Sequence, residues 1–358
     1  MKAKTALRET ARATRENPSF MINNKKAELA DSVQDHLGSD ASLKRMLQRE
    51  RRKDTPKDPK KLADLVIEEP YTKTIGDNDE RQQFLIYDNG QDSDARILVF
   101  ASPTGLRALA NSSVWFMDGT FSVAPMIFKQ LYAIRVPLSN SSVGVAYALL
   151  QNKTQETYEE MMRAIVTAME AILLYPNPDV VHLDFEQANI SAVRQVFGNE
   201  LTIRGCFYHL TQATWRKIQA LGLTNRYRED EDFKLFCGML DGLAFLPQDE
   251  VSEGFEYLRA NAPAGTKDLV DYFGANYVIG TFKRVTDRQT GGMRLRRVLP
   301  RHPIPLWNVH QATLNGEART NNTMEGWNNR FVHIVGLKAP INLDPYLGAS
   351  ERRPGCTR

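Results

Sequence analysis

The sequence predicts an α/β fold in which helices flank a mixed sheet, with a helical insertion late in the chain and a basic helical region before the sheet. Three observations support this prediction. Apolar runs of strand length occur at 114–123, 127–137 and 143–151, separated by short turns. Helical and strand patterns then alternate up to about residue 221. From 223 to 300 the pattern is mostly helical.

Composition limits the class of protein. The 358 residues are enough for two domains or for one domain with a large insertion, and 42% of them are hydrophobic, as in a globular protein. The three cysteines, Cys206, Cys237 and Cys356, are too few and too scattered for a disulfide framework, which favours a reducing compartment. No apolar run reaches the length of a membrane span, and the N-terminus lacks the apolar core of a secretory signal.

Charge is unevenly distributed along the chain. Residues 1–61 hold 16 Lys and Arg against 9 Asp and Glu, a net charge of +7, whereas the remainder holds 30 against 34, a net charge of −4. A basic segment before a mildly acidic body fits contact with a polyanion. A solvated, partly disordered tail fits the same charges.

The first segment is expected to be loosely ordered over 1–19 and helical over 24–37. A second helix is expected after Asp40. Its end carries a basic cluster of Arg49, Arg51, Arg52 and Lys53. Such a cluster could bind phosphates or act as a nuclear import signal. Prolines 56 and 59 then predict a linker or break.

The central elements are predicted from apolar patterning. Strands at 84–88 and 96–101 should form a hairpin, and a short helix should cover 103–110. The three apolar runs from 114 to 151 should form an antiparallel meander. The remaining elements are helices at 157–173, 187–197 and 210–221 and strands at 179–185 and 201–208. From residue 114 onward the order βββαβαβα is that of an RNase H-like domain.

The late part of the chain is expected to be a helical insertion that ends in a basic, glycine-containing loop. The best helices are 231–242 and 249–260, and a final helix should begin near Thr323. The loop, 283–301, contains the candidate phosphate contacts Lys283, Arg284, Arg294, Arg296 and Arg297. The predicted divisions are a basic helical region (1–62), a hairpin and helix (63–112), a first core part (113–222), the insertion (223–305) and a core completion with tail (306–358).

Three acids stand out, and each has an ordinary explanation. Asp118 lies within an apolar run, but Asp118-Gly119 is also a strong turn signal. Asp184 ends an apolar strand and shares a sheet face with His182, but an acid there could simply cap the next helix. Glu325 begins a helix at capping-box spacing from Asn322. If 114–123 and 179–185 are neighbouring strands, Asp118 and Asp184 come within reach of one metal ion.

Cys206 and His209 have a plausible ligand spacing, but no convincing second pair completes the four ligands of a zinc site. The favoured interpretation is that Cys206 is structural and that His209 supports the acidic residues without binding zinc.

Four segments in order resemble the Mutator-like element (MULE) transposase family. They are WFMDGTF at 115–121, HLDFEQA at 182–188, CFYHLTQ at 206–212 and PIPLWNVHQATLNGEARTNNTMEGW at 303–327. The resemblance spans roughly residues 80–335 and implies an RNase H-like core with a catalytic, metal-binding triad of Asp118, Asp184 and Glu325. Cys206 and His209 fall on the family's Cys-x-x-His element, which implies a structural or DNA-related role.

The resemblance also implies an activity and partners. Two Mg²⁺ ions, with Mn²⁺ as a substitute, would support cleavage and transfer of DNA strands. The partners would be double-stranded DNA, as transposon ends and target, and further copies of the chain in a dimer or higher multimer, without a membrane. The expected location is the nucleus.

A second function class is a transposase-derived DNA-binding or regulatory protein without turnover, including a truncated inactive copy. The lack of any cysteine before Cys206, where many relatives carry a zinc finger, and the short segment after Glu325 favour it. A third is an RNase H-like nuclease that cuts RNA. Loss of metal-dependent nicking in an Asp118→Asn variant would separate the first class from the second.

Overall fold

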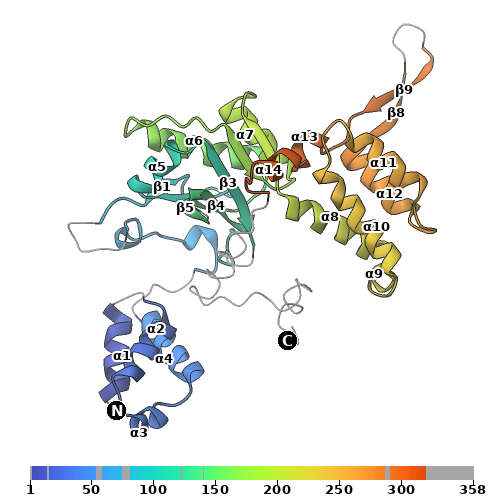
Figure 1. Ribbon diagram of the computed structural model, residues 1–358. Coiled ribbons are helices and arrows are strands. Elements are labelled where there is room, and N and C mark those ends of the chain that lie inside the picture. The colour runs from blue at the N-terminus through green and yellow to red at the C-terminus, as the bar shows by residue number, and fades with distance from the viewer. Residues whose placement is uncertain are drawn as a thin grey trace. The chain divides into compact units, whose positions relative to one another are not determined.

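The computed structural model describes residues 2–13, 16–53, 59–74, 81–121, 124–139, 141–286 and 291–319 (Figure 1). Two units, Met1–Asp64 and Leu65–Arg358, can be separated by their internal contacts. The predicted final helix from Thr323, including Glu325, lies outside the described residues. Among the described helices, none is both long enough and apolar enough to cross a membrane.

The N-terminal unit is a small helical cluster. Its elements are α1 Lys2–Ala13, α2 Pro18–Ala27, α3 Asp31–Gln34, the 3₁₀ turn η1 Asp35–Leu37, α4 Asp40–Lys53 and the 3₁₀ turn η2 Leu62–Asp64. Its buried side chains are Leu7, Ala11, Met21, Ile22, Leu37, Leu43 and Leu47. The helix expected after Asp40 is confirmed. The expectation of loose order over 1–19 is wrong, because α1 packs Leu7 and Ala11 against α4.

The predicted helix 24–37 is confirmed only in part, because the structure divides this range among the end of α2, α3 and η1. The chain instead begins α2 earlier, where the Asn17 side chain accepts a hydrogen bond from the Ser19 amide and Pro18 occupies the first turn. This cap and proline are a standard helix start. The residues of α2 that become buried are Met21 and Ile22, so the apolar stripe that defines the helix lies before residue 24.

The larger unit is built on a seven-stranded sheet. Its strands are β1 Leu85–Asp88, β2 Ile97–Ala101, β3 Val114–Thr120, β4 Gln130–Leu138, β5 Ser141–Leu150, β6 Val180–Leu183 and β7 Thr202–Gly205. The spatial order is β1-β2-β5-β4-β3-β6-β7. Pairing is antiparallel from β1 to β3 and parallel from β3 through β6 to β7. The predicted hairpin, meander and mixed sheet are therefore confirmed.

Helices cover one face of this sheet in Figure 1: α5 Pro103–Ala110, α6 Gln155–Glu170 and α7 Gln187–Phe197. They enclose the main core, which includes Trp115, Met117, Tyr158, Met161 and Val193. On the opposite face a smaller buried cluster contains Phe116 and Ala133. The architecture is the RNase H-like α/β fold that the sequence predicts.

A helical region follows β7. Its elements are α8 Phe207–Ala220, α9 Thr224–Glu229, α10 Glu231–Gly242, the 3₁₀ turn η4 Leu243–Phe245, α11 Val251–Ala260, α12 Lys267–Phe273 and the π-helical turn η5 Gly274–Val278. They share a second core that includes Phe236, Leu240, Phe255 and Phe273. Trp307 closes it, and its indole N–H lies 3.1 Å from the carbonyl oxygens of both Tyr277 and His302.

The chain then returns toward the sheet. Helix α13 Ile304–Trp307 contacts β7, and α14 His310–Leu314 contacts η4. Between the helical region and this return lies a two-stranded antiparallel ribbon, β8 Thr281–Thr286 and β9 Met293–Val298. Figure 1 shows it projecting from the helices. The expectation of a basic, glycine-containing loop over 283–301 is therefore wrong for the residues that form these two strands. At the base of the ribbon Gly280 has φ +82, a conformation that favours glycine.

Candidate active site and nucleic-acid interface

The two described acids of the predicted triad lie at one edge of the sheet. Strands β3 and β6 pair in parallel with Phe116 opposite His182. Asp118 and Asp184 each lie two residues further along, so the same register sets them side by side where β6 ends. Asp118 also pairs with Ala133 on β4, and Gly119 pairs with Tyr132. The Asp118-Gly119 pair is thus inside a strand, and the alternative of a hairpin turn is excluded.

Beneath the acids lies an aromatic pair on the same face of the sheet. The rings of Phe116 and His182 stack with their centroids 4.8 Å apart. Burial, together with the charge of the nearby Arg204, lowers the pKa of His182 to about 4 against the opposing effect of Glu317. His182 is therefore a neutral packing residue at pH 7, and it holds the strands on which the two acids lie.

Asp184 is held by its own chain. Its Oδ1 accepts a hydrogen bond of 3.3 Å from the backbone N–H of Glu186, which is the N-cap residue of α7. The Glu186 carboxylate in turn accepts hydrogen bonds from Lys153 Nζ at 2.9 Å and from Tyr158 Oη at 3.2 Å. Sequence reasoning missed Lys153, Tyr158 and Glu186. The only signal was a second acid two residues after Asp184.

One buried tyrosine, Tyr132, senses the charges of both acids. Burial raises the pKa of Tyr132 well above its ordinary value, and the charges of Tyr158, Asp184 and Asp118 raise it further. Its hydroxyl accepts a hydrogen bond of 2.8 Å from the Asn189 side chain. Next to Asp118, a Cβ on Gly119 would meet the Gln130 side chain, so only glycine fits there without a shift.

Cys206 and His209 are placed at the start of α8, beside this edge. The backbone N–H of Cys206 donates a hydrogen bond of 2.9 Å to the carbonyl of Leu183, the last residue of β6. Burial lowers the pKa of His209, while the charge of Asp184 opposes the shift, so the imidazole lies within electrostatic reach of that acid. The side chain of Cys206 is buried.

Metal-ligating residues do not form a complete cluster in the described ranges. In this part of the chain, no group of three His, Cys, Asp or Glu side chains is arranged to hold a metal ion. The third predicted ligand, Glu325, lies outside the described residues, so its capping-box alternative stays open. Asp118 and Asp184 supply two carboxylates, and oxygen donors of this kind are those that Mg²⁺ prefers.

The ribbon gathers basic side chains into two different faces. Cross-strand partners lie on the same face, so Lys283 with Arg296 and the neighbouring Arg294 form one cationic face. The other face carries Phe282, Arg284, Leu295 and Arg297. Phe282 and Leu295 are exposed by 61% and 68%. Like charges directly opposite each other are unfavourable, so the Lys283–Arg296 pair favours an anionic partner.

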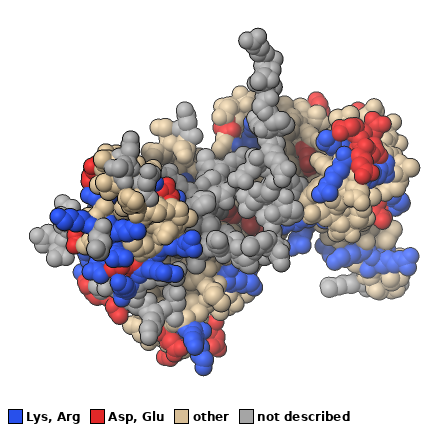
Figure 2. All heavy atoms as spheres, turned by 90° about the horizontal axis from the view of Figure 1, so that it is seen from below, with Lys and Arg blue, Asp and Glu red and all other residues tan. Residues whose placement is uncertain are grey.

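The basic cluster of α4 is partly used within its own unit. Arg51 donates a hydrogen bond of 2.6 Å to the carbonyl of Glu16 and one of 3.3 Å to that of Ala11. Lys53 pairs at 3.0 Å with the buried carboxylate of Glu50. Arg49 is exposed, whereas the Arg52 side chain is not among those described. In the view of Figure 2 the Lys and Arg side chains form separate groups, with Asp and Glu among them.

These contacts predict that two arginines of α4 differ in their effect on stability. Arg51→Ala should lower the stability of the N-terminal unit by about 1–2 kcal/mol, because two backbone carbonyls lose a charged donor. Arg49→Ala should leave stability unchanged, because this side chain is exposed. Thermal unfolding of the two variants measures both effects. An Arg51→Ala variant of unchanged stability would contradict this assignment.

Comparison with known proteins agrees with this geometry. Residues 114–213 match the family model of the MULE transposase domain. The match runs from the start of β3 into α8, and it contains Asp118, Asp184, Cys206 and His209. A search of curated proteins found no match. The chain carries a MULE transposase domain over residues 114–213.

Proposed function

We propose that this chain cuts DNA strands and transfers them, using a metal-dependent site composed of Asp118, Asp184 and Glu325. The observation that carries the proposal is the parallel register of β3 and β6, which brings Asp118 and Asp184 to the same edge of the sheet. The family match over both acids supports it. Glu325 is included only because its sequence motif resembles that of the family.

The donor set fits magnesium. Asp118 and Asp184 offer carboxylate oxygens at a partly exposed edge, and Glu325 would add a third carboxylate. Mg²⁺, or Mn²⁺ in its place, would supply charge stabilisation at the scissile phosphate and acidify a bound water. Two ions are expected, as in other carboxylate sites that act on phosphodiesters.

The surrounding residues keep Asp184 in position. The Glu186 N–H fixes one oxygen of Asp184, and Lys153 and Tyr158 restrain Glu186 in turn. Cleavage would be an in-line displacement in which water attacks phosphorus and the 3′-oxygen leaves. In strand transfer the freed 3′-hydroxyl would attack a target phosphate, and the target's own 3′-oxygen would leave.

Double-stranded DNA would be held by phosphate contacts away from the acids. The cationic face of the ribbon, with Lys283, Arg294 and Arg296, is the strongest candidate, because all three side chains are exposed. Arg49 is a weaker one. A DNA substrate implies that the protein acts in the nucleus, and paired transposon ends imply a dimer or higher multimer.

A nicking assay tests this proposal. Purified protein is incubated with supercoiled plasmid and Mg²⁺ or Mn²⁺, with EDTA and an RNA substrate as controls. The expected result is metal-dependent conversion of plasmid to the nicked form, with RNA left intact. DNA binding without nicking would favour the non-catalytic derivative, and cleavage of RNA alone would favour the RNase H-like nuclease.

A further inference from the structure

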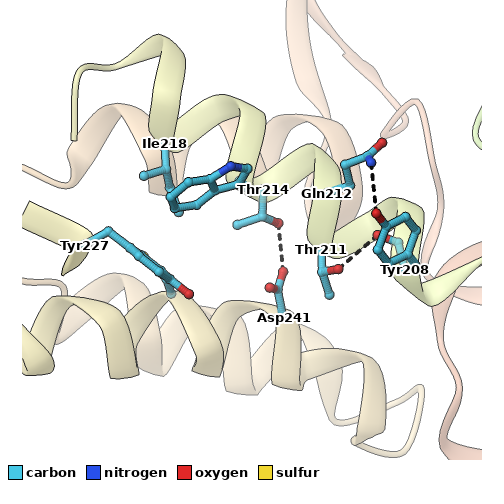
Figure 3. Close-up of a pocket in the computed structure, with 9 residues that line it drawn as sticks. Tyr208, Thr211, Gln212, Thr214, Ile218, Tyr227 and Asp241 are labelled. Atoms are coloured by element: carbon cyan, nitrogen blue, oxygen red, sulfur yellow. Dashed lines mark hydrogen bonds between the residues drawn. The ribbon is translucent and has the colours of Figure 1, made fainter. Parts of the chain in front are cut away.

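A cavity of about 230 Å³ lies between α8 and α10, outside the edge that carries the acids (Figure 3). Its apolar and aromatic lining consists of Ile218 and the rings of Trp215 and Tyr227, which contact each other edge to face with centroids 4.9 Å apart. Asp241 points into it from α10. A cavity of about 150 Å³ is known to hold benzene, so this one has room for a larger planar ring.

Asp241 is the chemically unusual member of the lining. Its Oδ1 accepts a hydrogen bond of 2.8 Å from the Thr214 hydroxyl. No Lys, Arg or His among the described side chains forms an ion pair with it, and burial raises its pKa to about 6. A carboxylate that is partly buried without a cation is unfavourable, so N–H donors from a ligand would stabilise it.

The cavity and the acids are connected through the first turn of α8. Tyr208 lines it, whereas the following residue, His209, lies within electrostatic reach of Asp184. From His209 to Trp215, α8 rises by about 9 Å. Successive nucleotides of one strand are about 3.4 Å apart when stacked and further apart when extended. A nucleotide two or three positions from a phosphate at the acids would therefore reach the cavity.

We propose that this cavity receives one unstacked base of the bound DNA strand and that it favours guanine. The inference rests on the proposed function, because it places the strand at Asp118 and Asp184. Enzymes that take up a single base pack it against aromatic or apolar side chains and read its pairing edge through hydrogen bonds. Guanine presents an N–H and an amino group side by side on that edge, which matches a carboxylate. Thymine presents one N–H between two carbonyl oxygens, which a carboxylate repels.

A binding measurement on the full chain tests this without cleavage. Fluorescence anisotropy with EDTA compares three thymidine strands of about 16 nucleotides that carry deoxyguanosine, deoxyinosine or thymidine at the centre. Inosine lacks only the amino group. Wild type should bind the guanine strand about tenfold more tightly than the inosine strand. Asp241→Asn should abolish this preference, whereas Asp232→Asn, an equal charge change on the exposed side of α10, should retain it.

The outcomes separate this inference from the proposed function. Equal binding of guanine and inosine strands by wild type overturns the cavity assignment, as does a preference that persists in Asp241→Asn. The measurement contains no metal, so nicking of plasmid without a preference for guanine would overturn only the proposed base site. A preference for guanine without nicking would support the base site and overturn the proposed cleavage site.

The pH dependence of the stability of the folded protein gives a second, independent test of the role of Asp241. The folded-state pKa of Asp241 lies above its ordinary value of 3.8, so the native state keeps a proton that the unfolded chain has lost. Stability should therefore fall as pH rises from about 4 to 6. The charge of Asp241 also acts on Cys237, Tyr227 and Tyr277. The pKa values of all three are raised, so none of them ionises between pH 4 and 6.

Asp241→Asn should accordingly match wild type in Tm at pH 4 and exceed it by about 2–4 °C at pH 8. This would show that the carboxylate is retained at a cost to stability. A variant that is less stable than wild type at pH 8 would mean that Asp241 makes a structural contact, and it would overturn the cavity assignment.

Discussion

Replacing Asp184 with asparagine lowers the rate of DNA nicking by on the order of 10³-fold or more in our account, while DNA binding is retained. Asparagine preserves the size of the side chain but removes the charge that would hold a divalent ion. A bound metal contributes several kcal/mol of transition-state stabilisation, and each 1.4 kcal/mol or so is a factor of about ten in rate. Asp118→Asn should have the same effect, because Asp118 occupies the equivalent position on β3.

Asp179→Asn is the matched control for this pair. Asp179 is exposed and precedes β6 at the opposite end of the strand, so it carries the same charge far from the proposed site. It should nick at the rate of wild type. Equal nicking by wild type and Asp184→Asn would show either a contaminating nuclease or a wrongly assigned acid.

Removing the three cations of the ribbon face should produce the second large effect, on DNA affinity. The variant Lys283→Gln, Arg294→Gln, Arg296→Gln should bind duplex DNA on the order of tenfold or more weakly at low salt. The slope of log affinity against log salt should fall by about 3, because each phosphate contact contributes about 0.9. Fluorescence anisotropy over a range of salt concentrations measures both quantities.

The control for the ribbon variant removes three cations from the helical region that precedes the ribbon. Lys234, Arg259 and Lys267 are exposed on α10, α11 and α12, and each is paired with an acid of its own helix. Their replacement by glutamine should leave the salt slope nearly unchanged. An equal loss of slope in both variants would mean that overall charge, and not the ribbon, determines binding.

The central fold was predictable because its elements carry strong local signals. The predicted helices 103–110, 187–197 and 231–242 have the bounds of α5, α7 and α10. In the sheet, short turns between apolar runs identified the meander. The parallel placement of β3 beside β6 was only a condition in the sequence argument, because strand order depends on tertiary packing.

Elements with weak apolar patterns were missed for physical reasons. In α1 the buried stripe is only Leu7 and Ala11 within a charged sequence, so the helix is defined by its packing against α4. The ribbon strands bury almost nothing, and a strand exposed on both faces has no apolar alternation to read. Lys153 and Glu186, 33 residues apart in the chain, meet only in the folded protein.

The most direct test of the central claim is a crystal structure of the protein with DNA and Mn²⁺, examined for anomalous scattering. The account predicts a metal peak within about 2.5 Å of carboxylate oxygens of both Asp118 and Asp184. It also predicts that Glu325 completes the ligand set. Bound DNA with no metal at these two acids, or a metal held by other residues, would contradict the assignment of a metal-dependent cleavage site at this edge of the sheet.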